Sequence, residues 1–268
     1  MIEKKKPLKN IKASKDFPDH QLYGSDLIAE ALREQSFPYI CLNPGASYRG
    51  LHDSLVNHIG NETPEIITCM HEEHAVGIAQ GYAKITDRAL AIAVHSNVGL
   101  MHASMGIFNA WCDRLPMLIL GATGPLDAAK RRPWIEWIHT TIDQGSMVRG
   151  FTKWDDQPAS PEAAVESIRR GVTLANTAPS GPVYINLDVT IQEQEIDVRP
   201  TFDDVSRFPI PHNAEPPKAA LEEALRVLSK ANRPFIFCGR GGRSEAEWHD
   251  RIKLAERLNA RTTTHMKL

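Results

Sequence analysis

The chain of 268 residues lacks the features that would place it at a membrane or on nucleic acid. No apolar run approaches the roughly 18 residues that a membrane-spanning helix requires. The formal net charge of −2 gives no basic excess for binding a polyanion. Residues 1–18 are lysine-rich and polar, without the apolar core of a secretory signal, and we expect a solvated tail there. We therefore expect a soluble protein without a membrane or nucleic-acid partner.

Cysteine is also scarce. The four cysteines, Cys41, Cys69, Cys112 and Cys238, lie far apart and form no Cys-x-x-Cys pair. This spacing argues against a disulfide framework and against a zinc site built from thiolates. Thiols without partners suit a reducing compartment, so we expect the protein to be cytoplasmic.

The remaining sequence alternates helical patterns with short apolar runs, which is typical of a parallel sheet covered by helices. We predict an α/β fold with a doubly wound parallel sheet and helices on both faces. The predicted strands are residues 38–42, 65–69, 89–95, 116–121 and 182–187, and the predicted helices are 25–35, 48–59, 72–85, 100–112 and 161–176.

The sheet pattern gives a domain over residues 19–195, and a proline-rich linker over 196–217 follows it. Residues 218–268 then read as helix, strand, glycine turn, helix and strand, the start of a second α/β domain. A segment of this size cannot bury a doubly covered sheet by itself. We expect the remainder either in a longer reading frame or on another polypeptide.

Polar loops follow four of the predicted strands, at residues 43–47, 72–73, 95–99 and 121–125. The carboxyl ends of parallel strands lie at one edge of a sheet, so these loops can share one crevice. Each loop alone has an ordinary explanation. Glu72 and Glu73 can simply complement a helix N-terminus, the Asn-Pro-Gly of residues 43–45 can be only a turn, and His95 can be a structural histidine.

Several ordered motifs add a resemblance to a known family. The pattern His71-Glu72-x-x-Ala75-x-Gly77-x-Ala79-x-Gly81-Tyr82-Ala83 is similar to the segment that bears the invariant glutamate of thiamine-diphosphate-dependent 2-oxo acid decarboxylases and carboligases. His95-Ser96-x-x-Gly99 resembles the active-site histidine loop of the benzoylformate decarboxylase type. Residues 106–116 are similar to the acetolactate synthase large subunit as well. The resemblance covers the pyrimidine-binding domain and, more loosely, the start of the middle domain.

This resemblance implies roles for particular residues. Glu72 would hydrogen-bond the pyrimidine ring of thiamine diphosphate and favour its imino form, while His95 would serve as a general acid/base. The implied cofactor-binding residues are Glu72, Pro44, Gly45, Gly99 and His102, although relatives usually carry asparagine at the position of His102. The implied substrate pocket contains Asn43, Ala46, Ser47, Ser96 and His139. The implied enzyme decarboxylates a 2-oxo acid and protonates or ligates the resulting carbanion.

The family also binds magnesium and the diphosphate through a Gly-Asp-Gly motif, and this motif does not occur in the 268 residues. We therefore expect no magnesium ligands on this chain. A second subunit would contribute the diphosphate-binding domain, in a homo-oligomer of at least two chains. The isolated chain would be inactive.

Two other interpretations stay open. The His71-Glu72-Glu73-His74 stretch resembles a zinc motif, but its histidines are three apart where that motif needs four, and the sequence shows no third ligand. Alternatively, the chain is a truncated or split, non-catalytic subunit that binds a partner chain carrying the diphosphate and magnesium domain.

Overall fold

The computed structural model describes residues 21–134, 136–207, 209–211, 214–239, 241–242 and 244–264. The polar tail predicted for residues 1–18 lies outside the described residues. The chain divides near residues 211 and 212 into two compact units. This division falls within the segment 196–217 that the sequence predicts as a linker.

The larger unit is built on one sheet of six parallel strands in the order β2-β1-β3-β4-β6-β5. The strands are β1 (Tyr39–Leu42), β2 (Glu65–Thr68), β3 (Leu90–Ala93), β4 (Met117–Thr123), β5 (Trp154–Asp156) and β6 (Pro182–Asp188). The order reverses direction between β1 and β3, and such a switch point opens a crevice at the carboxyl ends of the strands. The predicted doubly wound parallel sheet is confirmed.

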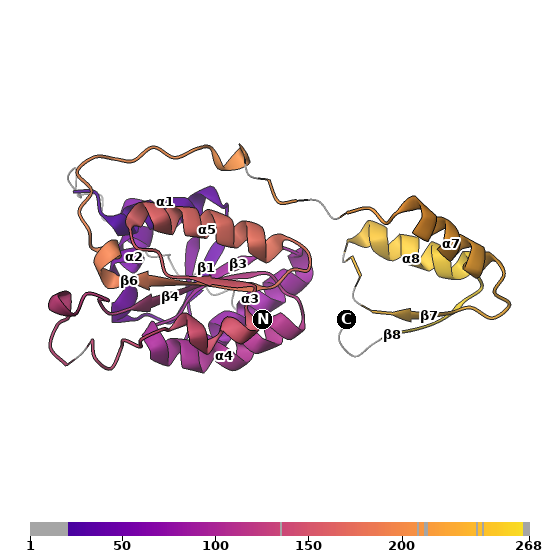
Figure 1. Ribbon diagram of the computed structural model, residues 1–268, viewed down its shortest axis with the longest axis horizontal. Coiled ribbons are helices and arrows are strands. Elements are labelled where there is room, and N and C mark those ends of the chain that lie inside the picture. Colours follow the sequence, from indigo (N-terminus) through magenta and orange to yellow (C-terminus); the bar gives the residue numbers. More distant parts are fainter. Residues whose placement is uncertain are drawn as a thin grey trace, which may run out of the picture. The chain divides into compact units, whose positions relative to one another are not determined.

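Helices cover both faces of this sheet (Figure 1). On one face lie α1 (Gly24–Glu34) and α5 (Pro161–Asn176), and on the other lie α3 (Glu72–Thr86) and α4 (Ser96–Cys112). Successive strand residues point to opposite faces. Thus Ile40 and Leu42 join the core under α1 and α5, while Cys41 joins the core under α3 and α4. Strands buried on both faces explain the continuous apolar runs in the sequence.

The structure departs from the sequence prediction at several boundaries. Strand β5 is missing from the prediction because its sequence, Trp-Asp-Asp, is short and polar. The predicted helix 48–59 is instead α2 (Arg49–Asp53) followed by a π-helical turn, Ser54–His58. Helix α4 begins at Ser96 and β4 continues to Thr123, so parts of two predicted loops are regular structure.

The smaller unit contains α7 (Lys218–Ser229), β7 (Phe235–Cys238), α8 (Glu245–Arg257) and β8 (Arg261–Thr264). Strands β7 and β8 pair in parallel, which matches the predicted βαβ unit. Ser244 caps α8, because its hydroxyl accepts a hydrogen bond from the Glu247 backbone amide at 3.2 Å. Helices α7 and α8 contain no buried residue, so this two-stranded layer has little core of its own.

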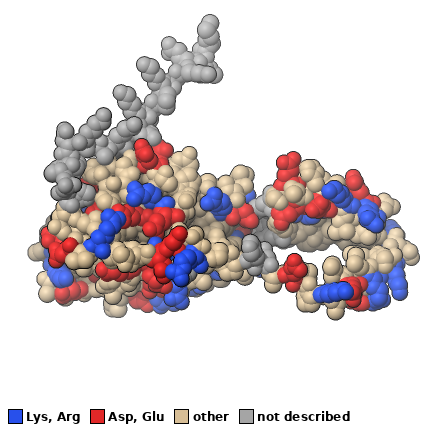
Figure 2. Space-filling model, turned by 90° about the horizontal axis from the view of Figure 1, so that it is seen from above, with Lys and Arg blue, Asp and Glu red and all other residues tan. Residues whose placement is uncertain are grey.

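Acidic and basic side chains are interspersed on the visible face of each unit (Figure 2). Among the helices in the described residues, none combines the length and the apolar character needed to cross a membrane.

Candidate functional site

Glu72 is the first residue of α3 and follows β2 at the carboxyl edge of the sheet. Only 4% of its surface is exposed. Because β1 lies beside β2, the residue that follows β1 can reach it: the Asn43 side-chain amide donates a hydrogen bond to Glu72 Oε1 at 3.2 Å. Neighbouring Glu73 is exposed. The carboxylate that faces inward is therefore Glu72.

The opposite side of the carboxylate is covered by α4. His102 Nδ1 lies 3.3 Å from Glu72 Oε2. One turn earlier, a Cβ on Gly99 would lie 3.0 Å from Glu72 Oε1 and 3.3 Å from its Cγ. A side chain at position 99 would therefore press on the carboxylate, so glycine leaves the space beside it open.

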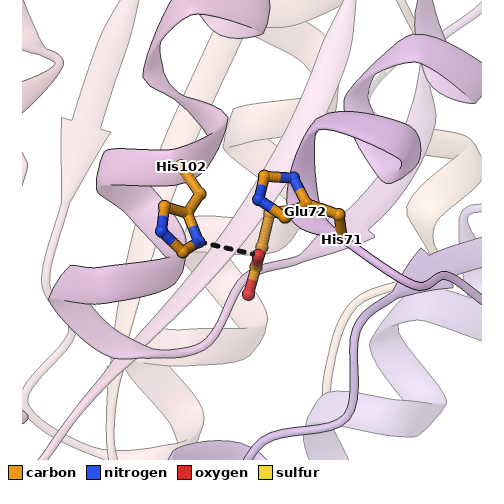
Figure 3. A group of neighbouring side chains, drawn as sticks. All are labelled: His71, Glu72 and His102. Carbon is orange, nitrogen blue, oxygen red and sulfur yellow. Dashed lines mark hydrogen bonds and ion pairs between the residues drawn. The ribbon is translucent and has the colours of Figure 1, made fainter.

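His71 completes this group, which we call the Glu72 cluster: His71, Glu72 and His102 (Figure 3). The rings of His71 and His102 stack with centroids 4.7 Å apart and an interplanar angle of 23°. In the sequence, His71 stands out only in the zinc-like stretch His71-Glu72-Glu73-His74, without His102 as a partner. Only the packing of α4 across the start of α3 brings it to His102.

A second group gathers around His95, the N-cap residue of α4. Its Nδ1 lies 2.8 Å from Ser47 Oγ, and its ring centroid lies 4.7 Å from that of His139. A Cβ on Gly45 would lie only 2.4 Å from His95 Cγ, so the loop after β1 packs directly on the imidazole.

Tyr48 joins the two groups. Its hydroxyl donates a hydrogen bond to the backbone carbonyl of Asn43, and its ring packs edge-on against His95 with centroids 6.4 Å apart. Burial, reinforced by the Glu72 charge, raises the pKa of the Tyr48 hydroxyl well above its usual value. The hydroxyl thus remains a protonated donor and fixes the segment between Asn43 and Ser47.

The pKa of His95 lies below the ordinary histidine value of 6.5, first because of burial and then because of the nearby His139, while Glu72 opposes the shift. We therefore expect His139→Gln to raise the His95 pKa toward 6.5, because the electrostatic interaction with His139 that lowers it is removed. NMR titration of the His95 ring in the full chain measures this shift. Glu72→Gln is the comparison, and it should lower the pKa further. An unchanged titration in both variants would contradict the geometry around His95.

Three other predicted residues are Pro44, expected at the cofactor, and Ala46 and Ser96, expected in the substrate pocket. Pro44 and Ala46 are exposed and line an open hollow of about 550 Å³ together with Arg49 and His52. Ser96 is fully buried, and its hydroxyl donates a hydrogen bond to Asn97 Oδ1 at 2.7 Å. In this structure these residues shape the loops but do not contact the carboxylate.

Gln192 is a site-supporting residue that the sequence did not reveal. It lies at the end of α6 (Val189–Gln192) and is fully buried. Its Nε2 donates to the Ser47 carbonyl at 3.0 Å, and its Oε1 accepts a hydrogen bond from the Leu51 amide at 3.4 Å. A lone glutamine in a short helix carries no local pattern, so only the tertiary contact identifies it.

Replacing Gln192 by alanine should lower the free energy of unfolding by about 1–3 kcal/mol, since buried backbone groups at Ser47 and Leu51 lose their partners. Chemical denaturation measures the change. Gln194→Ala is the matched control, because Gln194 is exposed and should change stability by less than about 0.5 kcal/mol. Equal losses in the two variants would show that the Gln192 contacts contribute nothing.

The Glu72 cluster is suited to a nitrogen heterocycle. A carboxylate shielded from water forms a short, charge-assisted hydrogen bond with a protonated ring nitrogen. Asn43 and His102 fix the two carboxylate oxygens, and Gly99 leaves room beside them. These residues therefore fit the pyrimidine ring of thiamine diphosphate.

Comparisons with known proteins agree with this fit to thiamine diphosphate. Residues 22–147 match the family model described as "Thiamine pyrophosphate enzyme, N-terminal TPP binding domain". The acetolactate synthase large subunit of Lactococcus lactis is 29% identical over 222 residues, which is 81% of this chain and 36% of that protein. A probable acetolactate synthase large subunit of Methanocaldococcus jannaschii is 25% identical, with 87% and 38% covered. The chain thus spans a little over a third of the length of these curated relatives.

Among solved structures, the thiamine diphosphate-dependent 4-hydroxybenzoylformate decarboxylase of Rhodococcus jostii superposes with a TM-score of 0.75 and 17% identity, over 91% of this chain and 44% of that one. At this identity the likeness establishes the fold alone. The family match and the curated relatives together confirm the resemblance seen in the sequence. Residues 22–147 of this chain therefore resemble the N-terminal TPP binding domain of the thiamine pyrophosphate enzymes.

Proposed function

We propose that this chain supplies the pyrimidine-binding half of a thiamine-diphosphate site, in an enzyme that decarboxylates a 2-oxo acid. One observation carries the proposal. Glu72 is a buried carboxylate at the switch point of a parallel sheet, with its two oxygens engaged by Asn43 and His102. When bound, thiamine diphosphate supplies the electron sink that makes loss of carbon dioxide feasible.

Glu72, Asn43 and His95 would then each have a separate role in the reaction. Glu72 would hold a proton on the pyrimidine ring nitrogen, and Asn43 would keep the carboxylate directed at that nitrogen. His95 would give and accept protons at the substrate, oriented by Ser47 through the 2.8 Å contact at Nδ1. Since burial lowers the pKa of His95, its imidazole is neutral near pH 7 and can accept a proton there.

The proposal includes a partner subunit that contributes the diphosphate and magnesium ligands. Helix α4 carries an exposed apolar stripe consisting of Val98, Met101, Met105 and Phe108, which are 39%, 56%, 57% and 42% exposed. Beside it, Gly77 of α3 has no neighbouring atom within 4 Å of its Cβ position. Contiguous apolar surface of this kind marks protein interfaces, so this face suits a second copy of the chain or a related subunit.

Two reaction types fit this proposal. In a simple decarboxylase the decarboxylated product is protonated, whereas in an acetolactate synthase-like carboligase it is joined to a second carbonyl. The acetolactate synthases among the relatives support the second type, and the histidine loop beginning at His95 supports the first. We also propose a cytoplasmic location, which the four cysteines, none of them in a disulfide, support.

The test is to purify the chain from its native cells, identify what co-purifies, and assay the assembly with thiamine diphosphate, magnesium and a panel of 2-oxo acids. We expect a partner with a Gly-Asp-Gly motif, or a longer form of this chain, and release of carbon dioxide from one substrate. An assembly that binds thiamine diphosphate without turnover would identify a non-catalytic subunit. Failure to bind thiamine diphosphate would overturn the proposal.

A further inference from the structure

We propose that the Glu72 cluster is also a binding site for one Zn²⁺ ion, which competes with the cofactor for Glu72. The competition rests on the proposed function, whereas the metal site itself rests only on geometry. The sequence offered two histidines near an acid but no third ligand. The structure supplies the third ligand from another helix, since His102 of α4 lies beside His71 and Glu72 of α3.

The positions of the donor atoms carry this inference. His71, Glu72 and His102 each offer one ligand atom, and the three atoms lie within 4.8 Å of one another. Glu72 Oε2 and His102 Nδ1 are already 3.3 Å apart. Donor atoms in a tetrahedral zinc site lie roughly 3.4 Å apart for bonds of about 2.0–2.1 Å. The cluster therefore needs only small side-chain rotations to close around an ion.

The ligand types select the metal. Two imidazole nitrogens and one carboxylate oxygen suit Zn²⁺, whereas Mg²⁺ prefers oxygen ligands alone. Figure 3 shows the His102 ring beside the carboxylate, joined to it by the dashed contact, and the His71 ring close to the same side chain. The His102 side chain is 50% exposed, so an ion can reach the cluster from solvent and retain a water molecule as its fourth ligand.

Of the contacts around these ligands, the one to Glu72 suits the ion and the one to His71 must break. Asn43 donates to Glu72 Oε1, which leaves Oε2 on the side of His102 for the ion. The Glu73 backbone amide contacts His71 Nδ1 at 3.2 Å, so His71 would bind through Nε2. Binding there places the remaining ring proton on Nδ1, and the Glu73 amide must then release this contact. Loss of that contact is a local signature that NMR can detect.

An ion on Glu72 Oε2 would occupy the carboxylate that the cofactor needs. Zinc and the pyrimidine ring could then not bind Glu72 at the same time. His102 is central to this competition, because an asparagine at its position could still hydrogen-bond Glu72 but would give no imidazole ligand.

The direct experiment is calorimetric titration of the untagged full chain with ZnCl₂, without thiamine diphosphate. We expect one ion per chain. His102→Asn should weaken binding by at least about tenfold, since loss of even an outer-shell partner typically costs ten- to a hundredfold. His74→Asn is the matched control and should bind as the wild type does, because His74 lies outside the cluster. Co²⁺ in place of Zn²⁺ should give the visible absorption of a tetrahedral site, which His102→Asn abolishes.

Absence of stoichiometric binding, or equal binding by wild type and His102→Asn, would overturn the metal site whatever the enzyme does. If zinc binds but does not weaken thiamine-diphosphate binding in the assembled enzyme, the competition is refuted. If the assembled enzyme binds no thiamine diphosphate even without zinc, the proposed function fails while the zinc site stands.

Discussion

Glu72→Gln should reduce turnover of the assembled enzyme by about 10²–10⁴-fold, the range typical for loss of a group that positions a proton in the reaction. The substitution keeps the shape of the side chain but removes the negative charge that would hold a proton on the pyrimidine nitrogen. Glutamine can still contact Asn43 and His102, so the fold should survive. Steady-state kinetics with saturating cofactor measure the loss, and thermal melting verifies the fold.

Glu73→Gln is the natural control. Glu73 is the next residue of α3 but is exposed, about 100° around the helix from Glu72. It complements the helix N-terminus, a contribution worth only about 0.3–1 kcal/mol. We expect its turnover to stay within a few-fold of the wild type. If both variants lost activity equally, the assignment of the inward carboxylate to Glu72 would be wrong.

Much of this architecture is readable from the sequence because it depends on local patterns. The apolar runs at β1 and β3, together with Ser160 and Pro161 at the start of α5, give strands and a helix near the observed residues. Parallel topology then brings the strand ends together, and the family resemblance singles out Glu72 and His95 among the loop residues. The fold class follows from the same periodicity.

Other features depend on contacts between distant segments and have no local signal. Strand β5 forms only because β6 offers it a parallel edge. Gln192 reaches Ser47 across 145 residues of sequence. The pairing of His71 with His102 depends on how α4 crosses α3, so the sequence indicates each histidine separately but not the pair.

The position of the segment between β4 and β5 also has no local signal in the sequence. This segment includes His139, and its described residues, all but position 135, form no long helix or strand before β5. The sequence identified His139 only by a loose resemblance. The structure brings it to His95 because its backbone carbonyl accepts a hydrogen bond from the Gly124 amide, next to the end of β4. This contact joins two loop residues, so no periodic pattern in the sequence predicts that His139 lies near His95.

Gly45→Ala should lower turnover by about a hundredfold, since a misplacement of roughly 1 Å in a catalytic group can cost that much. The new Cβ would lie 2.4 Å from Cγ and 2.7 Å from Nδ1 of His95, so the imidazole must move away from Ser47. Gly150→Ala is the matched control, because position 150 is exposed with nothing within 4 Å of its Cβ site. It should retain wild-type turnover.

A double-variant cycle shows whether Gly45 acts through His95. His95→Asn alone should reduce turnover at least as much as Gly45→Ala, because the acid/base group itself is lost. If the alanine harms activity only by displacing the imidazole, adding it to His95→Asn should cause little further loss. Fully multiplicative losses would instead mean that Gly45 contributes through another route, such as direct approach of its backbone to the cofactor. The cycle therefore separates the positioning of His95 from cofactor binding at the same loop.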